Sequence, residues 1–265
     1  MARVTRISIA PVKSLGLLHP DEVELTARGV VGNRRFWLVD ANRRLYNNKR
    51  NGPLVRIRPE WDETTRSLEL TFPDGARVAG TVELGEQPFE VEMYGYPLVS
   101  RRVLGPWEEA ISDYAGERLT LLWAEEGAPD RLHAGTASLV SRESIARLAE
   151  EVGVDDLDGR RFRMLFEIEG VRAHEEDEWQ GTQVRIGEAT IQVHGDVGRC
   201  AVTTHDPDTG VPTVDTLRAL AGYRPDGRKE RLPLGVYGSV VVPGRVRVGD
   251  EVAPTQERLI ATSLS

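Results

Sequence analysis

The 265-residue chain carries a formal net charge of −8, with 40% hydrophobic residues, 29% charged residues and a single cysteine. This is the composition of a globular protein, and its acidity argues against a general nucleic-acid or membrane-surface binder. No apolar run approaches the ~20 residues that span a bilayer, and one cysteine excludes an internal disulfide and CxxC metal motifs. The alternating pattern of residues 1–9 leaves no room for a signal peptide, so we expect a cytoplasmic protein.

The first 105 residues have the pattern of β structure. Short runs of β-branched and aromatic residues, bounded by Pro, Gly or Asp, predict strands over residues 4–9, 34–39, 54–58, 67–72, 89–93 and 98–103. Residues 40–43 predict a hairpin turn. Strands at such close spacing are typical of a barrel or a sandwich and not of a βαβ fold.

Three helices are expected, over residues 106–116, 141–152 and 213–222, from their caps and apolar spacing. Further strands are predicted at residues 119–123, 162–168, 182–186, 189–193, 200–204, 235–242 and 245–248. The acidic run at residues 175–178 predicts a solvated loop. The fold class is therefore mostly β with a few helices (α+β), in two β-barrel-like domains. A compositional seam at residues 127–131 predicts an N-terminal β-barrel domain over 1–127 and a second over 128–265.

Cys200 is the sharpest chemical feature of the sequence. Arg199 precedes it and would favour its thiolate, while Gly195 and Gly198 allow a ligand to approach closely. Taken alone, such a cysteine is more often a small buried residue of a strand. However, residues 28–58 hold nine basic residues against the single acid Asp40, and a second basic cluster covers residues 160–163. Guanidinium groups bind phosphate, so a thiolate beside them suggests a phosphate-bearing cofactor whose metal ion is coordinated by the cysteine sulfur.

Several other site classes are absent from the sequence. It has no GxGxxG, Walker, HExxH or GxSxG motif, and its five histidines lack metal-ligand spacing.

Around Cys200 and in the basic segments, the sequence resembles the MOSC family, the molybdenum-cofactor sulfurase C-terminal-like domains, in the form with an N-terminal β-barrel domain. The likeness is to bacterial relatives of the mitochondrial amidoxime-reducing component, and it runs along nearly the whole chain. The motifs that carry it are Pro11-Val-Lys-Ser14, Arg35-Phe-Trp-Leu-Val39, Arg161-Phe-Arg163, Arg199-Cys200 continuing to Asp206-Pro-Asp-Thr-Gly210, and Pro243-Gly-Arg-Val-Arg-Val-Gly-Asp250.

The resemblance implies the molybdenum cofactor, molybdopterin with its metal, and gives Cys200 the role of molybdenum ligand and catalytic residue. It also implies cofactor contacts from Lys13, Ser14, Arg35, Lys49, Arg163 and Arg199. Thr136 and Ser138 are further candidates for donors to phosphate or oxo groups. One departure stands out, because Met164-Leu165 occupy the place where relatives that reduce N-hydroxylated compounds have Pro-Asn.

The expected function is that of a molybdenum-dependent oxidoreductase that removes oxygen from a small N- or S-oxygenated molecule. No haem, flavin or iron–sulfur motif is present, so the electrons would come from a separate reductase. Two alternatives stay open. Cys200 could carry a persulfide in sulfur transfer, or the chain could bind molybdopterin as a carrier without catalysis.

Overall fold

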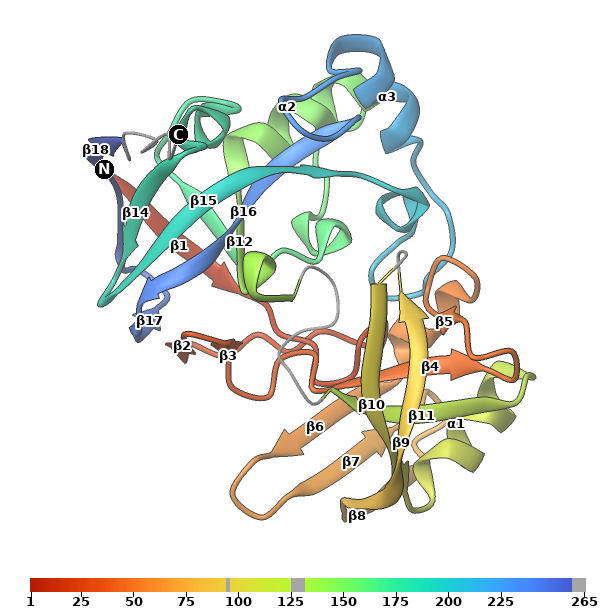
Figure 1. Ribbon diagram of the computed structural model, residues 1–265. Helices are drawn as coiled ribbons and strands as arrows, with labels where there is room; N and C mark the ends of the chain where they lie inside the picture. Colours follow the sequence, from red (N-terminus) through yellow and green to blue (C-terminus); the bar gives the residue numbers. More distant parts are fainter. Residues whose placement is uncertain (94–95, 125–131, 259–265) are drawn as a thin grey trace.

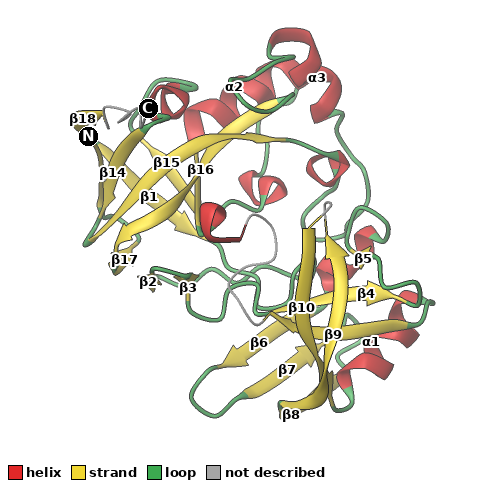
Figure 2. Ribbon diagram, viewed as in Figure 1, coloured by secondary structure: helices red, strands yellow, loops and turns green. Residues whose placement is uncertain are grey.

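The computed structural model describes residues 1–93, 96–124 and 132–258, and these form the predicted mostly β fold with three α-helices (Figures 1 and 2). The strands build one closed seven-stranded barrel and three further sheets. None of the helices in these ranges is long and apolar enough to cross a membrane.

The closed barrel combines the start of the chain with its second half. Its strand order is β1-β13-β12-β16-β15-β14-β18, and β1 closes it by pairing with both β13 and β18. All neighbours are antiparallel except β12 and β13. The strands are β1 (Ala2–Ile7), β12 (Ala137–Ser141), β13 (Phe166–Glu169), β14 (Thr182–Ile186), β15 (Ala189–Gly198), β16 (Pro233–Val242) and β18 (Glu251–Arg258).

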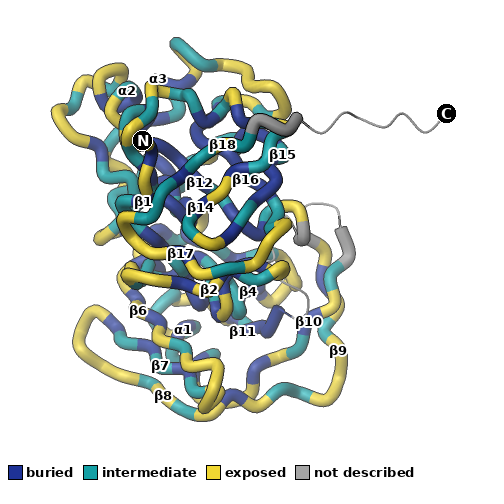
Figure 3. The backbone as a smooth tube through the Cα atoms, turned by 90° about the vertical axis from the view of Figure 1, so that its left-hand side faces the viewer, coloured by how far each residue is buried: buried dark blue, intermediate teal, exposed yellow. Residues whose placement is uncertain are grey.

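A small sheet packs its apolar side chains into the same core. Its order is β17-β2-β3, formed by β17 (Gly244–Arg247), β2 (Glu22–Thr26) and β3 (Gly29–Val30). Leu25 and Val246 are fully buried with the barrel residues, among them Phe166 and Ile191. Figure 3 colours the backbone by burial, and buried stretches lie among the strands of the barrel. Strands β1, β2 and β3 therefore share a core with the second half of the chain, whereas Val12 and Leu15, between β1 and β2, belong to the other core. The expected domain boundary at 127/128 lies outside the described residues.

The rest of the first half forms a second core, the lower part of Figure 1. A five-stranded sheet of order β5-β4-β11-β10-β9 packs with a three-stranded sheet of order β6-β7-β8 and with the first helix, around buried residues such as Phe36, Leu68 and Trp107. The elements are β4 (Phe36–Asp40), β5 (Leu45–Tyr46), β6 (Arg58–Asp62), β7 (Ser67–Thr71), β8 (Arg77–Thr81), β9 (Glu83–Met93), β10 (Tyr96–Leu104), α1 (Trp107–Ala115) and β11 (Leu119–Ala124). The predicted hairpin turn joins β4 and β5.

The helix predictions are confirmed, with one shifted start. Helix α1 ends at Gly116 in the left-handed conformation. Helix α2 (Arg142–Val152) begins at Ser141, whose side chain accepts a hydrogen bond from the Ser144 backbone N–H. Helix α3 (Thr216–Tyr223) begins three residues later than predicted, because Asp215 caps it by accepting from the Arg218 backbone N–H.

Of the predicted strands, the one at residues 200–204 is wrong throughout and those at 162–168 and 54–58 are wrong in part, and each overlaps a short 3₁₀ helix. Residues 200–204 form η5 (Ala201–Thr204), because the hydroxyls of Thr203 and Thr204 bond back to the carbonyls of Cys200 and Ala201. Residues 162–168 are strand only from Phe166, after η3 (Gly159–Phe162). Residues 54–58 lie mostly in η1 (Gly52–Arg56), which has Pro53 in its first turn. The remaining 3₁₀ helix before α2 is η2 (Leu132–Gly135).

The prediction of a solvated acidic loop is also wrong. Residues 175–178 belong to η4 (Glu175–Trp179), and the Glu176 side chain is fully buried. Its carboxylate accepts hydrogen bonds from the Ser141 backbone N–H and from the hydroxyls of Ser141 and Ser144. Glu176 therefore fixes the point where β12 passes into α2.

Candidate functional site

Three cationic side chains from separate segments gather where the two halves of the chain meet. The Lys13 backbone N–H donates to the Phe36 carbonyl at 2.7 Å, and that of Arg34 donates to the Ala10 carbonyl at 2.8 Å, which places Lys13 and Arg34 together. The Arg34 guanidinium donates to the Arg163 carbonyl at 3.4 Å. The Arg163 guanidinium donates in turn to the Leu15 carbonyl at 2.8 Å. Backbone contacts thus hold the three cations in one cluster.

The electrostatics of this cluster favour an anion. Burial, followed by the charges of Arg34 and Arg163, holds the pKa of Lys13 well below its usual range, while the electrostatic interaction with Cys200 acts to raise it. Burial and the Arg34 charge lower the pKa of Arg163 to about 9. The like charges of the cluster repel one another in a partly dehydrated place, and a bound anion would relieve that repulsion.

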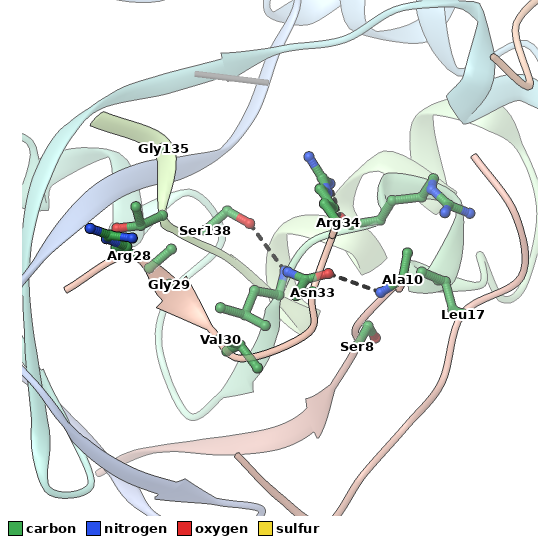
Figure 4. A pocket seen from close by; sticks show the side chains of 14 residues that line it. Ser8, Ala10, Leu17, Arg28, Gly29, Val30, Asn33, Arg34, Gly135 and Ser138 are labelled. Atoms are coloured by element: carbon green, nitrogen blue, oxygen red, sulfur yellow. Dashed lines mark hydrogen bonds between the residues drawn. The ribbon is translucent and has the colours of Figure 1, made fainter. Parts of the chain in front are cut away.

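A small pocket, open to solvent, is lined by two of these cations, Arg34 and Arg163 (Figure 4). The described residues that line it include three arginines and no acid: Ser8, Ala10, Leu17, Arg28, Gly29, Val30, Asn33, Arg34, Gly135, Thr136, Ala137, Ser138, Arg163 and Leu165. The dashed lines of Figure 4 include the bond from the Ala10 backbone N–H to the Asn33 side-chain oxygen, 2.9 Å long. The chemistry of the lining suits a compact oxyanion.

Two hydroxyls of this lining are the predicted candidates Thr136 and Ser138. The Thr136 hydroxyl accepts from the Val240 backbone N–H at 3.2 Å, and the Ser138 hydroxyl accepts from the Leu165 backbone N–H at 3.0 Å. Since each oxygen already accepts a bond, its own hydrogen is available to donate. Both residues can therefore donate to a ligand in the pocket.

Cys200 is not among the described residues that line this pocket. It follows β15, precedes η5 and is exposed. Its electrostatic interaction with Lys13 ties it to the cation cluster. The structure thus places Cys200 and Arg163 within electrostatic range of Lys13, and Arg163 lines the pocket together with Thr136 and Ser138.

Arg199 has a different role from the one its position in the sequence suggested. Its guanidinium donates to the Leu234 carbonyl at 2.9 Å, to the Phe162 carbonyl at 3.1 Å and to the Met164 sulfur at 3.0 Å. Its backbone N–H donates to the Leu232 carbonyl. These contacts anchor the residue before Cys200 to β16 and to the segment that precedes β13.

The other three predicted residues are spread around the cluster. Ser14 is buried directly after Lys13, with a left-handed φ of 77°. Arg35 lies 3.3 Å from Glu63 and 4.7 Å above the Trp123 ring, and Lys49 is exposed in the turn before η1. None of the three is among the described residues that line the pocket.

Arg34 and Arg28 were missed as individual site residues, although both fall in the arginine-rich segment that stood out in the sequence. Arg34 has a left-handed φ of 51°, a conformation that is uncommon outside glycine. This backbone conformation cannot be predicted from the residue types at positions 34 and 35, and it determines which of the two arginines contacts Arg163.

Comparison with known proteins gives two domain matches. Residues 1–114 match the MOSC N-terminal beta barrel domain and residues 129–253 match the MOSC domain. Mitochondrial amidoxime-reducing component 1 of Mus musculus is 24% identical over 94% of this chain and 81% of its own length. The molybdenum cofactor sulfurase of Anopheles gambiae is 26% identical over 90% of this chain, which spans only 34% of that protein. The crystal structure of the YUAD protein from Bacillus subtilis aligns with a TM-score of 0.47 at 14% identity, covering 95% of this chain and 93% of that one.

Proposed function

Since the chain belongs to the MOSC family, we propose that it binds the molybdenum cofactor and uses it to reduce a small N- or S-oxygenated molecule. The observation that carries this proposal is the cluster of Lys13, Arg34 and Arg163, with the single cysteine within electrostatic range of Lys13. The relatives of this chain include a protein named as an amidoxime-reducing component and others named as molybdenum cofactor sulfurases.

The residues of the pocket fit the cofactor. A phosphate needs several donors and positive charge, and the pocket offers Arg34 and Arg163 together with the hydroxyls of Thr136 and Ser138. A soft metal needs a thiolate, and Cys200 is the one sulfur of that kind in the sequence. Among the described residues, no group of three His, Cys, Asp or Glu side chains could hold a metal ion. In this proposal the protein therefore supplies a single ligand, and the pterin supplies the other sulfur ligands.

When bound, the cofactor would supply the two-electron redox chemistry. The chain's own residues would bind and orient it. Arg34 and Arg163 would hold the phosphate, Lys13 would add a further donor beside them, and Arg199 would fix the segment before Cys200 against the Leu234 carbonyl. The electrons would come from a separate reductase.

Met164 and Leu165 would make this site more apolar than that of the relatives with Pro-Asn. Both are buried, at 6% and 4% exposure, and Leu165 lines the pocket. The Met164 sulfur accepts from Arg199, so this residue also helps to hold the Cys200 segment. We therefore expect a substrate preference that differs from that of relatives with an amide at this place.

Sulfur transfer is a second candidate, and the exposure of Cys200 favours it. An accessible thiol within electrostatic range of Lys13 could carry a persulfide and pass its outer sulfur to an acceptor. The curated proteins named sulfurases are about three times as long as the part that this chain matches, so their whole activity does not transfer with the match.

The test is to purify the protein from a host that makes the cofactor and to supply a chemical reductant with a panel of N-oxides and S-oxides. We expect reduction that is lost in Cys200→Ala. Protein without molybdenum from that host would contradict the proposal. A Cys200 mass increase of one sulfur after incubation with a cysteine desulfurase, without any reduction, would favour sulfur transfer instead.

A further inference from the structure

The turn between β2 and β3 is rigid and carries Arg28 to the pocket. The Thr26 hydroxyl donates to the Gly29 carbonyl at 2.7 Å and accepts from the Arg28 backbone N–H at 3.2 Å. Leu25 pairs with Val30 on either side of the turn. Gly29 has a φ of +95°, and a Cβ there would lie 3.0 Å from the Thr136 carbonyl oxygen. The turn is thus pressed against the pocket wall and cannot shift freely.

Arg28 differs from the two other arginines of the pocket in its contacts. The guanidinium groups of Arg34 and Arg163 each donate to a backbone carbonyl. The Arg28 side chain is exposed and has no hydrogen bond or ion pair to the part of the chain that the structure describes. Its five N–H donors are therefore available to a ligand.

Arg28 also lies apart from those arginines. Figure 4 shows it beside Gly29 and Gly135, with Ser138 and Asn33 between it and Arg34. A ligand anion held by Arg34 and Arg163 at one side of the pocket therefore leaves Arg28 for a second anionic group. Guanidinium binds carboxylate and phosphate through two parallel hydrogen bonds, which sets both position and orientation.

We propose that Arg28 is a specificity-determining residue that binds an oxyanionic group of the substrate, a carboxylate being the simplest, at the mouth of the pocket. This inference rests on the proposed function, because it assigns the second anion to the molecule that is reduced. Selection of acidic substrates follows, since a neutral analogue would leave the Arg28 charge without a partner.

The experiment uses the cofactor-loaded protein and two probes, para-methylsulfinyl-benzoate and its methyl ester. Binding of each is measured by calorimetry without any electron donor, so the result does not depend on turnover. Arg28→Ala should weaken binding of the acid about tenfold or more and change binding of the ester less than about twofold. Arg28→Lys, which keeps the charge but not the paired donors, should recover part of the loss.

The matched control is Arg245→Ala. Arg245 is an exposed arginine of the same small sheet, opposite Glu24 in β2, and does not line the pocket. This variant should bind both probes as the original protein does. Equal weakening of acid and ester in Arg28→Ala, or no change in either, would overturn the inference.

Molybdenum and pterin content separates the two possible sources of the oxyanion. Unchanged content in Arg28→Ala supports the assignment to the substrate. Reduced content would assign the oxyanion to the cofactor and overturn the inference. Loaded protein that binds neither probe would also overturn it while leaving cofactor binding intact, whereas the absence of cofactor from every variant would be a failure of the proposed function itself.

Discussion

Replacing Glu176 with alanine removes the acceptor of three buried hydrogen bonds. The Ser141 backbone N–H, 3.1 Å from the carboxylate, loses its partner, and the hydroxyls of Ser141 and Ser144 lose theirs at 2.9 and 2.7 Å. The two hydroxyls can still bond to each other, since they lie 2.6 Å apart. About two buried donors stay unsatisfied, at about 1–3 kcal/mol each. With a cavity added, the free energy of unfolding should fall by about 3–6 kcal/mol.

Glutamine at this position separates the role of the hydrogen bonds from that of the charge. Burial raises the pKa of Glu176, so the buried charge is not itself a source of stability. Glu176→Gln keeps the shape and an acceptor and should change the free energy of unfolding by about 1 kcal/mol or less. Glu178→Ala, in the same acidic segment, serves as the control. Glu178 is 63% exposed, and its side chain forms a surface ion pair with Arg172.

Urea denaturation at neutral pH measures all three variants. A loss below about 1 kcal/mol in Glu176→Ala would refute the reasoning, because it would mean that the three donors do not depend on this carboxylate. A glutamine variant as unstable as the alanine variant would contradict the assignment of stability to hydrogen bonding.

Two further predictions concern stability. A Cβ at Gly52 would collide with the Gly210 carbonyl oxygen, so Gly52→Ala should lower the free energy of unfolding by about 1–3 kcal/mol or more, measured by chemical denaturation. The control is Gly222→Ala, whose added Cβ would meet no atom within 4 Å and which should not destabilise the protein. Burial, Arg224 and Arg147 lower the pKa of His174 to about 4. As the pH falls, the unfolded chain therefore protonates His174 at a higher pH than the folded chain does, and about 2 kcal/mol of stability should be lost between about pH 7 and pH 5. The loss should be smaller in His174→Asn. An equal loss in that variant would contradict the assignment to His174.

Features fixed by local sequence could be predicted. Pro106 and Gly116 bound α1 because their backbone preferences act within one turn, and Ser141 caps α2 through its own side chain. The β class followed in the same way from short runs of β-forming residues between turn residues. Cys200, Lys13 and Arg163 were found from residue type and motif, and the structure brings them together.

Features fixed by distant contacts could not be predicted. Glu176 lies in a run of four acids that looks solvated, and only its contact with Ser141 and Ser144, more than 30 residues away, buries it. The choice between Arg34 and Arg35 depends on one left-handed φ that brings the Arg34 guanidinium to the Arg163 carbonyl. Pairing across the fold overrides local patterns in both cases.

The most direct test of the proposed site is the pterin and molybdenum content of two variants purified from a cofactor-competent host. Arg163→Met should lose most of both, because it removes a charge from the anion-binding cluster. Cys200→Ser should keep pterin while its molybdenum X-ray absorption loses one sulfur neighbour. Arg245→Ala, exposed and outside the pocket lining, is the control for both. Full pterin content in Arg163→Met, or an unchanged sulfur shell in Cys200→Ser, would contradict the account.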